Sequence, residues 1–150
     1  MSRNSRRIVT GLDGEGRSTI LFDNALSGEV AQILWYSDTA PADNSGREDE
    51  GGREFSFDLL RTGGSVFLLA EVRPGDTYDA LMHATDTIDY VVVIRGRIEL
   101  LVETGSVELG AGDCVVDRGI LHGWRALGGE PALIAVAAIS ATPVGEGATL

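Results

Sequence analysis

The fold of this protein is decided by residues 88–116, which read IDYVVVIRGRIELLVETGSVELGAGDCVV. Short apolar runs alternate here with breaks that contain glycine, and each run has the length of a short strand. The runs are Ile88–Ile94, Ile98–Val102, Val107–Leu109 and Cys114–Val116. Strands this short, separated by closely spaced turn signals, predict an all-β sandwich or barrel.

The same pattern continues outward along the chain. Ser65–Val72 precedes the quoted stretch and is stopped by Pro74–Gly75, while His122–Leu127 and Ala132–Ile139 follow it. No window carries a long helical stripe of apolar residues. The second half of the chain therefore reads as a series of strands joined by turns.

The flanking segments are less regular. Arg7–Thr10 and Ser18–Phe22 border a glycine-rich loop and predict a hairpin, whereas residues 37–53 form a long polar stretch. We expect a single domain over residues 1–150. Its barrel core spans about 64–140, an N-terminal arm of extra strands spans about 1–63, and a flexible tail spans about 141–150.

Composition excludes several function classes. The chain has 150 residues and a formal net charge of -11, which disfavours nucleic acid and anionic membranes as partners. All 12 basic residues are arginine, so a Schiff-base lysine is excluded, and the single Cys114 excludes an intrachain disulfide or a cysteine-rich zinc site. No apolar run is long enough for a signal peptide or a bilayer span, so we expect a soluble cytoplasmic protein.

The two histidines, His83 and His122, limit any catalytic hypothesis. In an extended chain His83, Thr85 and Asp89 point to one side, because side chains alternate. A neighbouring strand that carries His122 would complete two histidines and one carboxylate, the facial triad that suits Fe, Ni, Zn or Mn. Alternatively His83 or His122 moves protons without a metal, and Asp89 orients one imidazole and raises its basicity.

The stretch from about Pro74 to Ile139 resembles the cupins, small jelly-roll barrels also described as double-stranded β-helices. The first cupin motif is Gly-x5-His-x-His-x3-Glu-x6-Gly, and its last four positions fall on His83, Thr85, Asp89 and Gly96. The second motif, Gly-x5-Pro-x-Gly-x2-His-x3-Asn, is approximated by Gly112, Arg118, Gly119 and His122. Thr85 replaces a histidine, Asp89 replaces the glutamate, and Ala126 replaces the asparagine.

The resemblance implies an all-β cupin barrel with extra N-terminal strands, a homodimer, and small-molecule metabolism such as polyketide tailoring. We expect an enzyme, a lyase, isomerase or cyclase, that acts on a small organic substrate inside the barrel. His83, Asp89 and His122 are the predicted catalytic and metal-binding residues, and the predicted substrate pocket contains Thr85, Trp124, Arg118 and Trp35. The alternative is a barrel that binds or senses a small ligand without catalysis.

Overall fold

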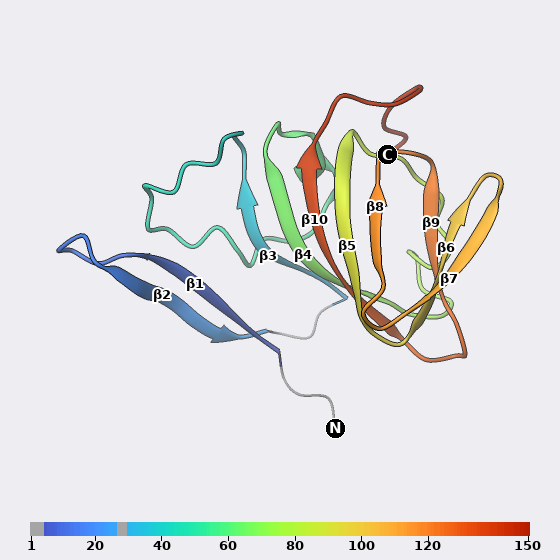
Figure 1. The fold of residues 1–150 in the computed structure, drawn as a ribbon, viewed down its shortest axis with the longest axis horizontal. Helices are drawn as coiled ribbons and strands as arrows, with labels where there is room; N and C mark the ends of the chain where they lie inside the picture. The colour runs from blue at the N-terminus through green and yellow to red at the C-terminus, as the bar shows by residue number, and fades with distance from the viewer. Residues whose placement is uncertain (1–4, 27–29) are drawn as a thin grey trace.

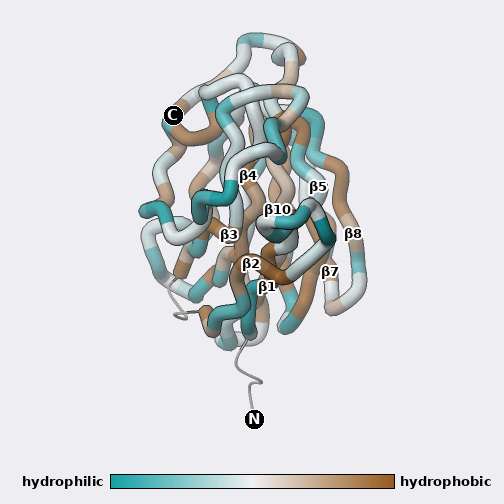
Figure 2. The backbone as a smooth tube through the Cα atoms, turned by 90° about the vertical axis from the view of Figure 1, so that its left-hand side faces the viewer, coloured by the Kyte–Doolittle hydropathy of each residue, from teal (hydrophilic) through white to brown (hydrophobic). Residues whose placement is uncertain are grey.

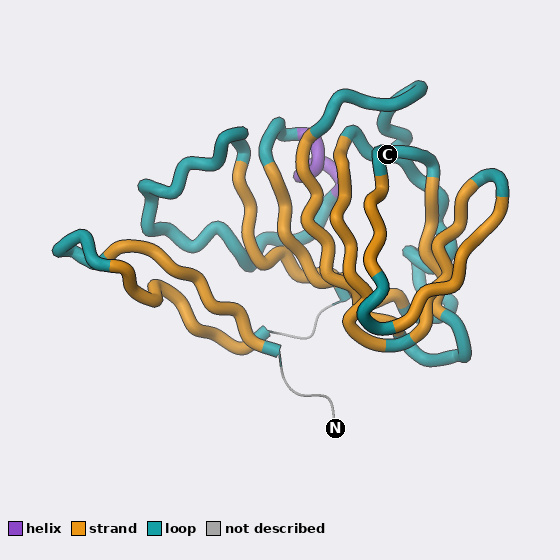
Figure 3. The backbone as a smooth tube through the Cα atoms, viewed as in Figure 1, coloured by secondary structure: helices purple, strands orange, loops and turns teal. Residues whose placement is uncertain are grey.

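The computed structural model describes residues 5–26 and 30–150, and its regular structure is almost entirely β (Figures 1 and 3). The strands are β1 (Arg6–Leu12), β2 (Ser18–Ala25), β3 (Ala31–Ser37), β4 (Ser65–Val72), β5 (Thr87–Arg95), β6 (Arg97–Val102), β7 (Gly105–Gly110), β8 (Cys114–Asp117), β9 (His122–Ala126) and β10 (Ala132–Ser140). One 3-10 helix, η1 (Phe57–Arg61), precedes β4. Within the described residues, no helix has the length and apolar character required to span a membrane.

Two antiparallel sheets form the barrel. The larger sheet has the order β3-β4-β10-β5-β8, and the smaller has the order β7-β6-β9. Figure 1 shows the smaller sheet beside the β5–β8 end of the larger one. The predicted all-β class is thus confirmed, and the turn-separated runs of the sequence are the strands of the two sheets.

The main core lies between these two sheets. Val91, Val93 and Ile134 project from the larger sheet, while Ile98 and Trp124 project from the smaller, and all five are buried. Full burial of one such side chain contributes about 1.5–3 kcal/mol. The packing therefore fixes β5 and β9, the strands that carry three of the predicted site residues, relative to each other.

The predicted N-terminal hairpin is present as an outlying sheet. β1 and β2 pair antiparallel with each other, and within the described residues they join neither barrel sheet. The Arg7 side chain links the hairpin to the barrel, because it donates hydrogen bonds to both carboxylate oxygens of Asp49 and to the carbonyl of Leu34. Figure 2 has the hairpin facing the viewer, with brown apolar residues along it, which fits the exposure of Ile8 and Ile20.

The segment after β10 returns to the barrel, and we call residues 141–149 the C-terminal strap. Its backbone amides at Ala141 and Ala148 donate to the carbonyl and the carboxylate of Asp86, at 3.0 Å and 2.8 Å. Thr149 exchanges two further hydrogen bonds with Ala84, each 2.9 Å long. The strap therefore holds residues 84–86, immediately beside His83.

Candidate active site

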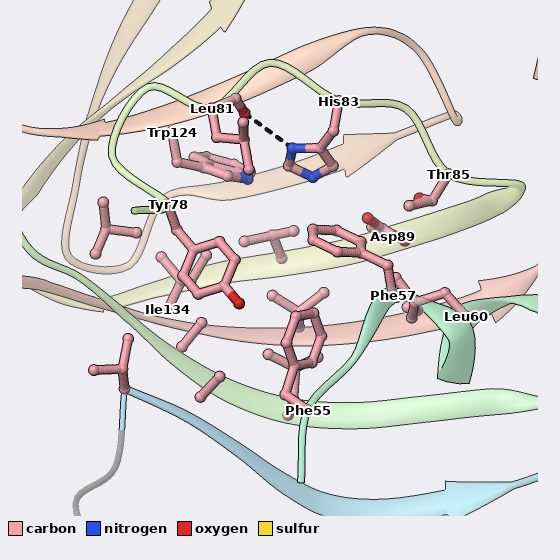
Figure 4. A pocket seen from close by; sticks show the side chains of 18 of the residues that line it. Phe55, Phe57, Leu60, Tyr78, Leu81, His83, Thr85, Asp89, Trp124 and Ile134 are labelled. Atoms are coloured by element: carbon pink, nitrogen blue, oxygen red, sulfur yellow. Dashed lines mark hydrogen bonds between the residues drawn. The ribbon is translucent and has the colours of Figure 1, made fainter. Parts of the chain in front are cut away.

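A cavity of about 120 Å³ opens between the larger sheet, β9 and the segment that leads to η1 (Figure 4). Its walls are mostly aliphatic and aromatic. The polar and ionisable side chains among them are Glu71, Tyr78, His83, Thr85, Asp89 and His122. Four of these, His83, Thr85, Asp89 and His122, are predicted site residues, and the structure brings them together in one cavity.

The two histidines meet because their backbones pair. His83 and His122 form an isolated antiparallel bridge, with reciprocal N–H to carbonyl distances of 2.8 Å and 2.9 Å, and their ring centroids lie 4.5 Å apart. Gly123 permits this close approach. A Cβ atom there would lie 2.9 Å from the sulfur of Met82 and 3.1 Å from the carbonyl of Leu81.

Each imidazole is held by a backbone carbonyl. Nδ1 of His83 lies 2.9 Å from the carbonyl oxygen of Leu81, and Nδ1 of His122 lies 2.9 Å from that of Ile120. A carbonyl oxygen only accepts hydrogen bonds, so Nδ1 carries a hydrogen in both rings. Nε2 is therefore the nitrogen that exchanges protons with a ligand, and Figure 4 shows this nitrogen of His83 turned toward the cavity.

Asp117 is the site residue that the sequence analysis missed. It ends β8 directly opposite Asp89 on β5, and its side chain is buried. Oδ1 accepts hydrogen bonds from the amides of Gly119 and Ile120, while Oδ2 lies 2.8 Å from Nδ1 of His122. The hydrogen on Nδ1 is directed at Ile120, so Oδ2 is a buried oxygen that accepts no hydrogen bond among the described residues.

A left-handed glycine shapes the turn that follows Asp117. Gly119 has a φ of +74°, and a Cβ atom there would lie 3.0 Å from the carbonyl oxygens of Thr85 and Thr87. Any other residue at this position would have a strained backbone, and its side chain would displace the start of β5. This glycine lets the β8–β9 turn pack against the segment that carries Thr85.

Asp89 is held by two threonines. Thr85 and Thr87 share a hydrogen bond of 2.7 Å, and the hydroxyl of Thr87 donates to Oδ1 of Asp89 at 2.7 Å. Burial raises the pKa of Asp89 to about 6, and the facing carboxylate of Asp117 adds to this rise. The Thr87 hydrogen bond and the charge of His122 act in the opposite direction. Asp89 therefore titrates close to neutral pH.

The pKa values of the two histidines shift in opposite directions. Burial lowers the pKa of His83, with only partial compensation from the Leu81 hydrogen bond and the charge of Asp117. Burial also acts to lower the pKa of His122, but the adjacent Asp117 carboxylate outweighs it and the net pKa is raised. A neutral imidazole thus lies beside one that favours its charged form, which is an acid–base pair.

The described residues also include a group with metal-ligand chemistry. Ligand atoms of Asp89, Asp117 and His122 lie within 4.8 Å of one another. Two carboxylates and one imidazole suit a divalent cation, and the unpartnered Oδ2 of Asp117 is a donor that a cation would satisfy. His83 is not part of this group, so the predicted ligand set of His83, Asp89 and His122 stays a prediction.

The other predicted pocket residues divide into two groups. Thr85 and Trp124 line the cavity, whereas Trp35 and Arg118 do not. The pairing of β3 with β4 is irregular between Ile33 and Trp35, so a simple alternation of side chains does not hold along β3. Arg118 follows the inward-facing Asp117 and is exposed.

Three aromatic residues at the cavity were also missed by the sequence analysis. Phe55 and Phe57 approach from the end of the polar loop, and Tyr78 approaches from the turn after β4. The Phe57 ring contacts the His83 ring, with centroids 5.1 Å apart. The available signal in the sequence was the pair of phenylalanines at positions 55 and 57, directly after a long polar stretch.

Comparison with known proteins identifies the fold. A cupin domain model matches residues 68–138. The chain is 32% identical over 136 residues to phomopsin biosynthesis cluster protein D of Diaporthe leptostromiformis, covering 82% of this chain and 71% of that protein. It is 24% identical over 128 residues to the cupin-domain-containing oxidoreductase srdD of Neurospora crassa, covering 79% of this chain and 64% of that protein.

A solved protein with a double-stranded β-helix domain from Klebsiella pneumoniae gives a TM-score of 0.48 at 24% identity, over 66% of this chain and 96% of that one. The predicted jelly-roll barrel with extra N-terminal strands is confirmed by the family match together with the sheet order described above. The chain belongs to the cupin superfamily.

Proposed function

We propose that this cupin is an enzyme of secondary metabolism that transfers a proton at the carbon next to a carbonyl group of a small molecule. Isomerisation, cyclisation, dehydration and decarboxylation all use such a step. The observation that carries the proposal is the pair of imidazoles, 4.5 Å apart, at the polar end of a mostly apolar cavity. The likeness to a biosynthesis cluster protein of Diaporthe leptostromiformis supports the assignment to secondary metabolism.

The geometry assigns a different role to each histidine. Nε2 of His83 is the base, because burial favours the neutral ring and Nδ1 keeps its hydrogen on Leu81. Nε2 of His122 is the acid, because the Asp117 carboxylate favours the charged ring. His83 removes the proton from carbon while His122 donates a hydrogen bond or a proton to the carbonyl oxygen. Asp117 positions His122 without touching the substrate.

A metal-assisted version rests on the unpartnered Oδ2 of Asp117. Asp89, Asp117 and His122 would hold a divalent cation, and a bound cation would supply Lewis-acid polarisation of the substrate carbonyl. In that version His83 remains available as the base, since it is not part of the ligand group. Its Nε2 still faces the cavity, so its proton-transfer role is unchanged.

Hydrogen–deuterium exchange tests the proposed reaction class. The protein is incubated in D₂O with a panel of ketones and 1,3-diketones, aliphatic and aromatic, and deuterium at the carbon next to the carbonyl is measured by NMR. We expect exchange of at least one panel member above the buffer rate, and a decrease of about 100-fold in His83→Gln and in His122→Gln. Circular dichroism and thermal unfolding verify that both variants fold.

Two results would contradict the enzyme assignment. One is exchange that equals the buffer rate for every ketone. The other is exchange that persists at the wild-type rate in a folded His83→Gln, His122→Gln double variant. Binding of a ketone without exchange would instead identify a ligand-binding cupin.

Elemental analysis decides between the two versions of the site. The protein is purified without a histidine tag or chelator and compared with Asp117→Asn. About one equivalent of iron, nickel, zinc or manganese, lost in the variant, would establish the metal site. A parent protein that contains no metal and takes up none when it is added would leave the metal-free acid–base pair.

A further inference from the structure

The charge of the cavity lining restricts what it can bind. Among the described residues, the ionisable lining residues are Glu71, Tyr78, His83, Asp89 and His122, with no arginine, and the chain contains no lysine. Glu71 already pairs with Arg73 at 2.7 Å and with Arg95 at 3.3 Å. The positive charge that His122 carries when protonated is balanced by Asp117 at 2.8 Å, so a carboxylate or phosphate ligand would meet no uncompensated positive charge and would lie near Asp89. The lining therefore selects a neutral ligand.

The size of the cavity restricts the ligand further. Its volume is about 120 Å³. An apolar protein cavity of about 150 Å³ holds one benzene molecule. The space therefore has about the size of a single six-membered ring, and a second fused ring would extend through the open side of the cavity.

The walls present ring faces and edges to this space. Phe55 and Phe57 meet edge-on with centroids 5.3 Å apart, and both contact Tyr78, at 6.2 Å and 6.4 Å. These separations lie in the range at which aromatic rings attract one another. Figure 4 shows the rings of Phe55, Phe57, Tyr78 and Trp124 arranged around the same space as His83 and Asp89.

The polar groups are confined to one part of the lining. The His83 ring meets the Phe57 ring edge-on at 5.1 Å and lies tilted to the His122 ring at 4.5 Å, so the aromatic wall leads directly to the two proton-transfer groups. A planar ligand in contact with the wall would place a short substituent at the imidazoles.

We infer that the ligand is a neutral aryl ketone with a single ring, or a molecule that presents such a group. Its ring lies among Phe55, Phe57 and Tyr78, and its carbonyl lies at His83 and His122. The position of the carbonyl rests on the proposed function, whereas the choice of a neutral single ring rests on the cavity alone.

Binding of four probes, followed by NMR titration, tests this inference. Acetophenone is the neutral single-ring ketone. Benzoate keeps the ring but is anionic, 2-acetonaphthone adds a fused ring, and cyclohexyl methyl ketone has a similar size without aromaticity. We expect the affinity for acetophenone to be about fivefold higher than the affinity for cyclohexyl methyl ketone. It should exceed the affinities for benzoate and 2-acetonaphthone by a larger factor. Equal or tighter binding of any one of the other three would overturn the inference.

A pair of matched variants locates the probe. Phe57→Leu keeps an apolar side chain and removes the ring, so acetophenone affinity should fall about fivefold while cyclohexyl methyl ketone affinity stays constant. Phe67→Leu is the control, because Phe67 is 47% exposed on β4 and does not line this cavity. An unchanged acetophenone affinity in Phe57→Leu, or an equal loss in Phe67→Leu, would contradict the assignment.

The two proposals fail in different ways. Selective acetophenone binding without deuterium exchange would overturn the proposed reaction and leave the ligand class intact. Exchange of aliphatic ketones together with weak acetophenone binding would overturn the ligand class and leave the reaction intact.

Discussion

The segment around His83 and the start of β9 at His122 present the same side chain to the same cavity in opposite electrostatic settings. His83 lies before a strand, half-buried, with a carbonyl as its hydrogen-bond partner. His122 is 2% exposed and lies 2.8 Å from a buried carboxylate. With one well-placed carboxylate beside His122, the pKa values of two rings 4.5 Å apart therefore shift in opposite directions.

The two regions also differ in how they are held. His122 belongs to β9, which pairs with β6 along its length. His83 lies outside the long strands, and its segment is held by the bridge to His122 on one side and by hydrogen bonds from the C-terminal strap to residues 84 and 86 on the other. His122 is therefore held by a sheet, whereas the His83 segment is held by a small set of hydrogen bonds.

Asp117→Asn should remove the difference between the two histidines and have the largest effect. Loss of one member of a buried ion pair costs about 3–5 kcal/mol. The pKa of His122 should then fall, since burial is opposed only by the Ile120 hydrogen bond and the charge of Asp89. In the wild type, the stability from His122 is complete below pH 6.5 and is lost as the pH rises through the raised pKa. In the variant, this loss of stability with rising pH should be smaller.

Histidine NMR titration and urea unfolding in the presence of a chelator measure both effects. Asp58→Asn is the control, because the Asp58 side chain is 87% exposed on η1. A His122 pKa that does not fall in Asp117→Asn would show that the carboxylate does not cause the difference.

Asp89→Asn should stabilise the protein at neutral pH. The pKa of Asp89 is raised from 3.8 to about 6, so the folded state loses stability as the pH rises through this window. Asparagine carries no charge and can still accept the Thr87 hydrogen bond. The variant should gain roughly 3 kcal/mol above pH 6 and nothing below pH 3.8. Urea unfolding of chelator-treated protein from pH 3 to 8 checks this, and a gain that is independent of pH would contradict the assigned pKa.

Asp86→Ala should loosen the His83 segment alone, with the smallest effect on stability. It removes the acceptor of the Ala148 amide, a hydrogen bond to a carboxylate that contributes about 1.5–3 kcal/mol. Amide exchange measured by mass spectrometry should increase at residues 83–86 and stay unchanged at residues 122–126. Asp43→Ala is the matched control, since it removes a similar carboxylate-to-amide bond from the exposed polar loop.

Much of the fold could be predicted because it depends on local signals. The turn glycines and short apolar runs between Ser65 and Ile139 indicated the strands, and the N-terminal hairpin followed from its glycine-rich loop. His83, Thr85 and Asp89 line one cavity with His122, as their motif spacing indicated, although β5 begins only at Thr87 and residues 84–86 do not form strand. Their predicted roles stay predictions. The homodimer, the cytoplasmic location and the flexible tail stay predictions.

The missing parts of the site depend on contacts that are distant in sequence. Asp117 faces Asp89 only through the register of β8 on β5, which pairs residues from different turns of the barrel. Phe55 and Phe57 reach the cavity from a loop without periodicity. The C-terminal strap bonds mainly through backbone amides, which every residue except proline possesses, so its sequence carried no signal.

The strap has a practical consequence for anyone who handles the protein. Thr149 is hydrogen-bonded to Ala84, one residue from His83, so an affinity tag or fusion partner joined after Leu150 would pull on the segment that presents the base. A tag at the opposite end would be attached near the β1–β2 hairpin, on a sheet that joins neither sheet of the barrel within the described residues. Preparations that differ only in whether a tag follows Leu150 would then differ in the amide exchange of residues 83–86.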